Sequence, residues 1–255
     1  MKGCVAEYRD CALEDIAERY IEGSPQISTA PVHRGAFIHG IDTVDKSTDE
    51  HTTLYDILFY ASLPDSEEQI GLFINVEAQN NYYPEYPLIK RSIYYCSRML
   101  SAQFGRDFAD GHYENLKKIY SIWICANAPQ NRSNTVTQYE LTKKHLLGEA
   151  KEDRVNYDLL SVVMVCFNGR YSTDLLESKE NPMTAKLVQL LHMILSADVD
   201  QEEKLKCMAD EYNIPMTREL EEEAARMCNL SRGYMERGIE RVSLSVNRKS
   251  SKSST

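Results

Sequence analysis

Short apolar runs separated by turn-forming residues constrain the fold of this chain most strongly. The runs at 54–61, 69–79, 118–127 and 160–168 are rich in β-branched and aromatic residues. Runs of this length and composition, bounded by polar turns, are typical of β-strands. A further strand candidate, NTVTQYEL, covers residues 134–141. The chain is therefore expected to contain a β-sheet.

Amphipathic helices are predicted before and after the first strands. Residues 12–22 have apolar side chains at a helical spacing, and Gly23 follows as a helix stop. Residues 87–105 end at Gly105 and place four apolar side chains on one face, namely Ile89, Ile93, Cys96 and Leu100. Beyond about residue 180 the sequence has a helical pattern throughout. This order predicts an α/β domain with a helical C-terminal region.

Charge is distributed unevenly and marks the expected domains. The net charge of −10 argues against a protein that coats DNA through bulk charge. Residues 198–226 alone hold ten acidic and four basic side chains, so the rest of the chain is closer to neutral and leaves room for a local basic surface. We expect an α/β domain at 1–175, an acidic helical region at 176–243, and a disordered basic tail at 244–255.

Cysteine usage and hydropathy indicate a reducing compartment. The seven cysteines are widely spaced, form no CxxC pair and mostly lie in apolar stretches. We therefore expect buried free thiols and no zinc site. No apolar run approaches the roughly 20 residues that span a membrane, and the N-terminus has no secretory signal. The chain is predicted to be cytoplasmic, with no membrane partner.

Acidic residues at the end of a predicted hairpin form the main candidate site. The turn SLPDSEE joins the first two apolar runs, which predicts a β-hairpin. Alternation places Glu77 and Gln79 on one face while Ala78 points away, and Asp56 comes within cross-strand reach of Glu77. Two carboxylates on one face, with no basic residue in either strand, favour a cation such as Mg²⁺. The alternative from spacing alone is a solvated sheet face.

Three stretches carry a resemblance to a known family. They are YDILFYA, INVEAQNNYYPEYPLIKRSIYYCSRMLSAQFG and KIYSIWICANAPQNRSNTVTQYELTKKHLLG, and the first two contain an Asp followed 21 positions later by Glu-x-Gln. They resemble the PD-(D/E)XK nuclease superfamily, and more closely its Rpn-type recombination-promoting nucleases and transposases of Firmicutes. The likeness covers roughly residues 4–242 and is collinear with that family.

The resemblance implies a restriction-endonuclease-like αβββαβ core and a metal site. In that family the Asp, the Glu and the carbonyl of the next residue bind Mg²⁺, with Mn²⁺ as an alternative, and this carries over to Asp56, Glu77 and the backbone of Ala78. The last motif position is usually Lys, where this sequence has Gln79. An amide can hydrogen-bond a water or a phosphate but carries no charge. The departure weakens the expectation of robust cleavage.

Basic residues on the helix after the motif are candidates for the missing positive charge. If the four apolar residues of 87–105 form the buried face, Lys90 flanks that face and Arg91 and Arg98 lie nearly opposite to it. Lys90 is therefore predicted to reach back toward the sheet as a catalytic group. Arg91 and Arg98 are predicted to contact DNA phosphates. The alternative for all three is a solvated helix face.

Other residues leave alternatives open. Five tyrosines flank this helix and either stack on bases or, as we favour, pack against the hairpin: Tyr82, Tyr83, Tyr86, Tyr94 and Tyr95. The superfamily often draws an extra acid from its first helix, for which Glu14, Glu18 and Glu22 are equal candidates. Relatives begin with a further helical segment, which raises the alternative of a truncated copy.

Two functions from different classes follow. The first is a Mg²⁺-dependent DNA endonuclease of low sequence specificity, linked to recombination or transposition. The second is a catalytically weak or inactive nuclease-like module. This module would bind a partner through the helical tail, either as a homodimer through residues 217–242 or with a longer relative.

Overall fold

The computed structural model describes most of the chain, in two units. The described residues are 1–27, 44–45, 53–54, 57–64, 71–79, 82–83, 85–105, 107–168, 181–195, 199–214, 216–218 and 221. One unit comprises Met1–Phe167 and the other Asn168–Thr255, and each is described by itself. The expected domain boundary at residue 175 lies outside the described residues and stays a prediction.

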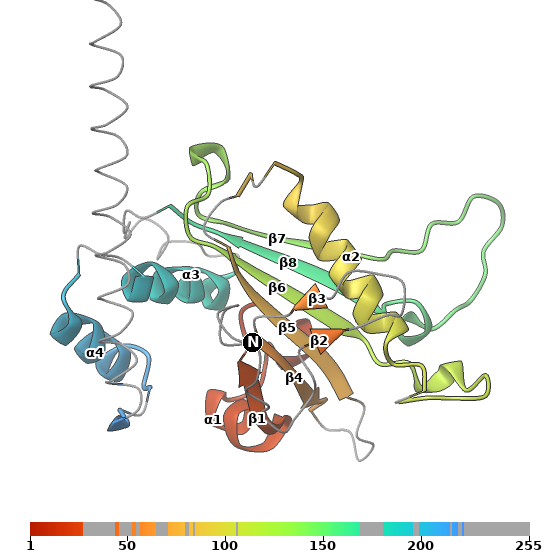
Figure 1. Ribbon diagram of the computed structural model, residues 1–255, viewed down its shortest axis with the longest axis horizontal. Coiled ribbons are helices and arrows are strands. Elements are labelled where there is room, and N and C mark those ends of the chain that lie inside the picture. Colours follow the sequence, from red (N-terminus) through yellow and green to blue (C-terminus); the bar gives the residue numbers. More distant parts are fainter. Residues whose placement is uncertain are drawn as a thin grey trace, which may run out of the picture. The chain divides into compact units, whose positions relative to one another are not determined.

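A six-stranded mixed sheet forms the centre of the first unit (Figure 1). Its strands are, in spatial order, β1 (Ile21–Ile27), β4 (Ile57–Ser62), β5 (Gly71–Gln79), β6 (Ile119–Cys125), β8 (Leu160–Cys166) and β7 (Thr135–Glu140). The strands β5, β6 and β8 run parallel, whereas β1, β4 and β7 are antiparallel to their neighbours. A separate antiparallel pair joins β2 (Val44–Asp45) to β3 (Thr53–Leu54).

The order of elements gives the core its class. A short helix α1 (Leu13–Asp15) continues into a π-helical turn at Ile16–Tyr20. Then follow β1, β4 and β5, the helix α2 (Leu88–Ser101), and β6. A parallel pair needs a crossover connection, and α2 supplies it between β5 and β6. This mixed α/β sheet with its αβββαβ order confirms the predicted restriction-endonuclease-like fold class.

The predicted strands are found where the structure describes them. The runs at 69–79, 118–127, 134–141 and 160–168 correspond to β5, β6, β7 and β8. The first apolar run differs, because β4 begins only at Ile57. Apolar composition therefore identified the buried strands well, because a strand between two covered faces needs apolar side chains on both.

The first predicted helix is shorter than expected. Helical structure ends at Tyr20, and Ile21 already belongs to β1, where it pairs with Ala61 of β4. The prediction that Gly23 stops this helix is wrong, because Gly23 lies inside the strand. Sheet pairing thus outweighs the helical spacing of the last apolar residues of the segment.

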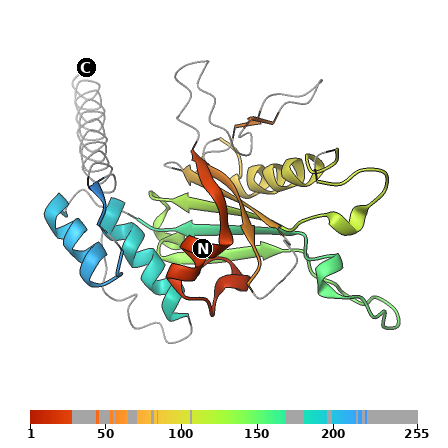
Figure 2. The ribbon, with the colours of Figure 1, turned by 90° about the horizontal axis from the view of Figure 1, so that it is seen from below.

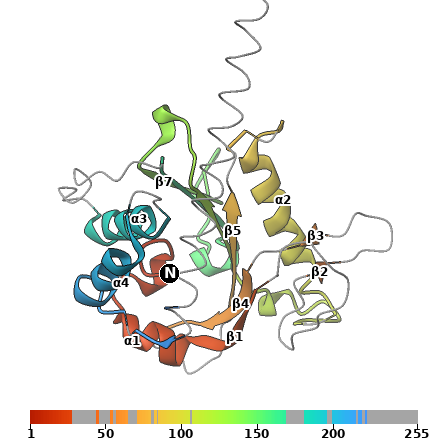
Figure 3. The same cartoon turned by 60° about the vertical axis from the view of Figure 1, so that its left-hand side comes forward.

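The helix α2 covers one face of the sheet, with a side that matches the predicted one only in part (Figure 3). Of the four predicted residues, Cys96 is buried and Ile89 and Leu100 pack against the core. The buried residues of α2 are Leu88, Ser92, Tyr95, Cys96 and Met99. Ile93 was placed on the buried face and is 44% exposed. The prediction for Ile93 is wrong because it ignored Ser92, whose hydroxyl donates to the Ile89 carbonyl at 2.8 Å and so can be buried.

The N-terminal segment covers the opposite face of the sheet (Figure 2). Tyr8 is fully buried, and its hydroxyl donates to the carbonyl of Ser62 on β4 at 2.6 Å. The Tyr120 hydroxyl of β6 donates to Glu7 at 2.6 Å. Successive residues of β6 face opposite sides of the sheet, so Tyr120 lies under this segment while Trp123 lies under α2.

The second unit contains α3 (Pro182–Leu195) and α4 (Gln201–Asp210). Asp200 caps α4, because its carboxylate accepts from the Glu203 backbone N–H at 2.8 Å. The expected helix at 217–242 and the basic tail at 244–255 lie almost wholly outside the described residues. Among the residues that are described, no helix is long and apolar enough to cross a membrane.

Candidate active site

Glu77 is a buried carboxylate near the carboxyl end of β5. The residue is only 3% exposed and pairs in register with Trp123 of β6. Partners in register share a face, so the Glu77 side chain is on the face that α2 covers. The pKa of Tyr95 on α2 is raised, mainly by burial, and the negative charge of Glu77 contributes to that rise. Glu77 and Tyr95 therefore lie within electrostatic reach of each other.

Arg91 lies between Tyr95 and Trp123 on this face. Its guanidinium carbon is 4.9 Å from the Tyr95 ring centroid and 5.3 Å from the Trp123 ring centroid. Its Nη2 and Nε donate to the Tyr95 hydroxyl at 2.6 and 3.0 Å, and its Nη1 donates to the Tyr86 hydroxyl at 3.1 Å. The half-buried Arg91 guanidinium is thus held beside Trp123, the residue of β6 that pairs with Glu77.

The structure reverses the predicted orientations of Lys90 and Arg91. Lys90 was expected to reach toward the sheet, but it is exposed. Arg91 was expected on the outer face, but its guanidinium lies over the Trp123 ring. Arg98 is half-buried and follows Arg91 by two helical turns, on the same side of α2. The reason is the rotation of the buried face from Ile93 to Tyr95.

The other motif residues are described only in part. Asp56 lies outside the described residues. It directly precedes Ile57, which pairs with Val76, and Glu77 directly follows Val76. The backbones of Ala78 and Gln79 belong to β5 and pair with Ile124 and Cys125 of β6. Their side chains are not among those described.

Trp123 and Tyr95 belong to the site, although the sequence did not single out Trp123. The indole is fully buried, its Nε1 donates to the Ser121 hydroxyl at 2.9 Å, and its ring centroid lies 5.6 Å from that of Tyr95. Trp123 is the only tryptophan of the chain and lies on the strand that follows the motif helix. This position was the sequence signal that could have identified Trp123 as a site residue.

The predicted group of five tyrosines divides into two kinds. Tyr95 is buried and Tyr82 is half-buried against the core. Tyr83, Tyr86 and Tyr94 are 60%, 45% and 45% exposed. Packing, which the sequence favoured, therefore accounts for the first two but not for the other three.

The acid expected from the first helix is not resolved in favour of one candidate. Glu14 is exposed, and the side chains of Glu18 and Glu22 are not described. An acid that the sequence missed, Glu7, lies under the other face of the sheet.

The donor chemistry around Glu77 fits a hard divalent cation in one respect. A buried carboxylate offers the oxygen ligand that Mg²⁺ prefers. Within the described part of the chain, no group of three His, Cys, Asp or Glu residues could hold a metal ion. Glu77 is therefore a candidate for one ligand, and Asp56, the other predicted carboxylate ligand, lies outside the described residues.

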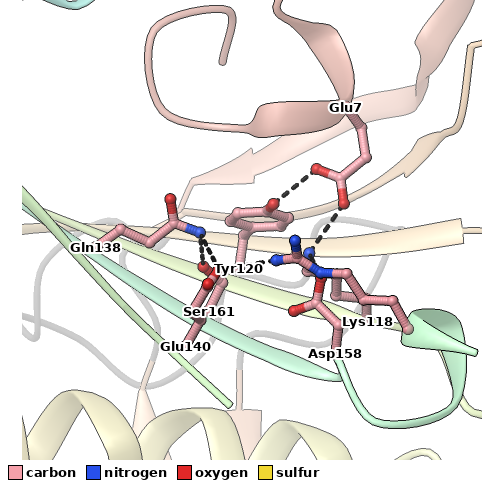
Figure 4. Close-up of polar contacts among 8 residues, drawn as sticks. Glu7, Lys118, Tyr120, Gln138, Glu140, Asp158 and Ser161 are labelled. Atoms are coloured by element: carbon pink, nitrogen blue, oxygen red, sulfur yellow. Dashed lines mark hydrogen bonds and ion pairs between the residues drawn. The ribbon is translucent and has the colours of Figure 1, made fainter. Parts of the chain in front are cut away.

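A second polar cluster lies under the N-terminal segment (Figure 4). Lys118, whose side chain is 12% exposed, donates to Glu7 at 3.0 Å and to Asp158 at 2.8 Å. Arg154 contacts the same Asp158 oxygen at 3.0 Å and Glu140 at 3.1 Å. Positive and negative groups alternate through the cluster. It joins the N-terminal segment to the start of β6 and to the turn before β8.

The titration behaviour of this cluster follows from its contacts. Burial lowers the pKa of Lys118, but hydrogen bonds and charge interactions, first with Asp158 and also with Glu7, outweigh burial and raise it. Burial, followed by the hydrogen bond to Glu7, raises the pKa of Tyr120. Each of the three acids is paired with at least one of the two cations, so these contacts stabilise the fold.

Comparison with known proteins supports the family resemblance. Residues 65–162 match the model of a family described as PD-(D/E)XK nuclease family transposase. The matched range includes Glu77, Gln79, Lys90, Arg91 and Arg98, and it begins after Asp56. No curated protein and no solved structure matches the chain. The match indicates a nuclease-like or transposase-like activity on DNA, in a family that typically uses divalent metal ions.

Proposed function

We propose that this chain is a metal-dependent DNA endonuclease of low sequence specificity, of the Rpn type and linked to recombination or transposition. One observation carries the proposal: the buried Glu77 lies near the end of the second hairpin strand of an αβββαβ core, on the same face as the Arg91 guanidinium. A carboxylate in this position offers the hard oxygen ligand that Mg²⁺ prefers.

Asp56, Glu77 and the Ala78 carbonyl would hold the metal, Mg²⁺ or alternatively Mn²⁺. Support comes from the register, because the chain neighbours of Asp56 and Glu77 are the paired residues Ile57 and Val76. The bound metal supplies a water of lowered pKa and stabilises charge on the phosphodiester. Glu77 would also set the position of that charge relative to Arg91, which lies on the same face of the sheet.

Gln79 would orient the attacking water, and Arg91 would supply the positive charge that the motif lacks. A guanidinium has five N–H donors. Three of those of Arg91 go to Tyr95 and Tyr86, and two have no partner among the described residues. Two parallel donors suit a phosphate, and Lys cannot reproduce that geometry. Arg98, on the same side of α2, would extend the phosphate contact. Lys90 is the less favoured candidate because it is exposed.

The test is plasmid nicking with Mg²⁺ or Mn²⁺. We expect the wild type to nick and Asp56→Ala and Glu77→Gln to lose nicking, because each removes a metal ligand. Arg91→Lys is expected to slow nicking about 10²–10³-fold, as for the loss of a donor that stabilises transition-state charge. Lys90→Ala is the matched helix control and should nick like the wild type. Wild-type activity no greater than that of Glu77→Gln would refute the proposal.

A second measurement detects metal without turnover. Trp123 is the only tryptophan and pairs with Glu77, so a paramagnetic Mn²⁺ bound at Glu77 should quench its fluorescence. Glu77→Gln should abolish saturable quenching. Saturable quenching without nicking would indicate a metal-binding but inactive module. That outcome corresponds to the alternative function, in which the helical tail at 217–242 binds a second copy or a longer relative. No described contact favours that alternative.

A further inference from the structure

Arg132 and two tyrosines form a second cationic surface beside the carboxyl end of β5. Arg132 lies in the turn between β6 and β7, and its guanidinium carbon is 5.1 Å from the Tyr82 ring centroid. Tyr82 and Tyr83 lie shortly after β5 and contact each other edge to face, with centroids 5.0 Å apart. We refer to Tyr82, Tyr83 and Arg132 as the tyrosine–arginine surface.

The surface is held in place by its surroundings. The Arg132 carbonyl accepts from the Thr135 hydroxyl at 2.7 Å, and its backbone N–H donates to the Pro129 carbonyl at 2.8 Å. The pKa of Arg132 is raised by its electrostatic interaction with Tyr82, and hydrogen bonds to Tyr83 and Tyr139 contribute. Tyr82 packs against the core, so the guanidinium and the Tyr83 ring are positioned before any ligand arrives.

The tyrosine–arginine surface lies at the end of the sheet where β5 carries Glu77 and Gln79. The burial-raised pKa of Tyr82 also responds to the nearby thiols of Cys125 and Cys166. Those two residues are in register with Gln79 across β5, β6 and β8. Figure 1 shows the turn after β6 and the start of α2 at the same end of the sheet. A strand bound at Glu77 can therefore continue onto this surface.

Exposure distinguishes a binding role from packing alone. Tyr83 is 60% exposed and Arg132 is also exposed. The turn PQNRSNT around Arg132 contains no acidic residue, in a chain whose net charge is −10. The nearest acid in sequence to Tyr83 is the exposed Glu85. Packing explains why Tyr82 is where it is, but it leaves an aromatic ring and a cation side by side in solvent.

An aromatic ring next to a cation suits a nucleotide whose base is not paired. The bases of a duplex stack on one another, whereas an unpaired base can stack on a side-chain ring while its phosphate meets an arginine. A duplex backbone alone would use the cation but not the ring. The chemistry of this surface thus favours a single strand over a continuous duplex.

We propose that the tyrosine–arginine surface binds an unpaired segment of the DNA strand, with a base on Tyr83 and a phosphate on Arg132. The proposal rests on the endonuclease function above and names the form of its substrate, DNA with a single-stranded region next to the cleaved bond. Neither the family match nor the motif assigns a role to Arg132.

The experiment measures binding of a fluorescent oligothymidylate, and of a duplex of the same length, by anisotropy in EDTA. Tyr83→Ala should weaken oligothymidylate binding about tenfold or more, as for the loss of one stacked base. Arg132→Lys should weaken oligothymidylate binding several-fold. The positive charge stays, but the planar guanidinium that lies over the Tyr82 ring is lost. Tyr113→Ala is the matched control, since Tyr113 is 65% exposed and lies outside the surface. Duplex binding should change little in all three variants.

The outcomes separate this inference from the endonuclease proposal. Equal losses for Tyr83→Ala and Tyr113→Ala would overturn it, and so would stronger wild-type binding to the duplex than to oligothymidylate. If the wild type never nicks but Tyr83 still governs oligothymidylate binding, only the endonuclease proposal fails. If nicking needs Glu77 while Tyr83→Ala binds normally, only the binding surface fails. Unchanged Trp123 emission checks that each variant is folded.

Discussion

Lys118→Met is the substitution that most directly tests how the N-terminal segment is held. Methionine keeps much of the length and packing of the lysine stem against the Tyr120 ring, whose centroid is 4.8 Å from Nζ. It removes the contacts to Glu7 at 3.0 Å and to Asp158 at 2.8 Å. Glu7 retains the Tyr120 hydroxyl, and Asp158 retains Arg154. The variant therefore measures the contribution of the buried Lys118 charge to stability, because both acids keep another partner.

The expected loss of unfolding free energy is about 3 kcal/mol. Breaking a buried ion pair by removing one partner costs about 3–5 kcal/mol. The low end applies because both acids keep one hydrogen bond and the Glu7 side chain is 24% exposed, so water can replace part of what is lost. For a folding unit of this size, about 3 kcal/mol lowers Tm by about 6–12 °C.

Thermal unfolding followed by the fluorescence of Trp123 measures this loss. Arg154→Met is the matched control, because Arg154 contacts the same Asp158 oxygen with a side chain that is 62% exposed. Exposed pairs contribute little, so its Tm should fall much less. Equal falls for the two variants, or a fall below about 2 °C for Lys118→Met, would refute the argument that burial sets the strength of this contact.

Two further predictions follow from the titratable groups. Because the pKa values of Lys118 and Tyr120 are raised in the folded state, the native protein keeps protons that the unfolded chain releases above about pH 10; unfolding free energy should hold below that pH and fall above it. Denaturation across pH 8–11 should show a shallower fall for Tyr120→Phe than for the wild type, and an equally steep fall would contradict the assignment. In native thiol labelling, the cysteines that are buried in the described part of the chain, Cys4, Cys96, Cys125 and Cys166, should be protected until unfolding. Cys11 should react faster than Cys207, whose pKa is raised to about 11 by burial and by Glu211, and peptide mapping would show the order.

Composition predicted the buried strands because burial requires apolar residues within each strand's own sequence. The runs that became β6 and β8 are apolar on both faces, which is what a strand covered on both sides requires. Strand alternation likewise assigned Glu77 and Gln79 to one face from neighbouring residues alone. The structure buries Glu77 on the face that α2 covers.

The parts that sequence did not predict depend on partners far along the chain. The face of α2 turns toward Tyr95 because Trp123 and the strands beneath it select that side, and apolar spacing within the helix pointed to Ile93 instead. The orientations of Lys90 and Arg91 changed with it. The contact of Lys118 with Glu7 joins residues that are 111 positions apart, so no local sequence pattern predicts it.

That separation also sets a timetable for folding during synthesis. Glu7 is made long before Lys118, and the network closes only when Asp158 has been added. At about 5–20 residues per second, the N-terminal segment waits roughly 8–30 s for the last of these partners. Until then Tyr8, which is fully buried in the finished protein, has no sheet to cover it. The residues around Glu7 and Tyr8 are thus made early but reach their final contacts late, and the nascent chain is most vulnerable to aggregation and proteolysis before β8 emerges.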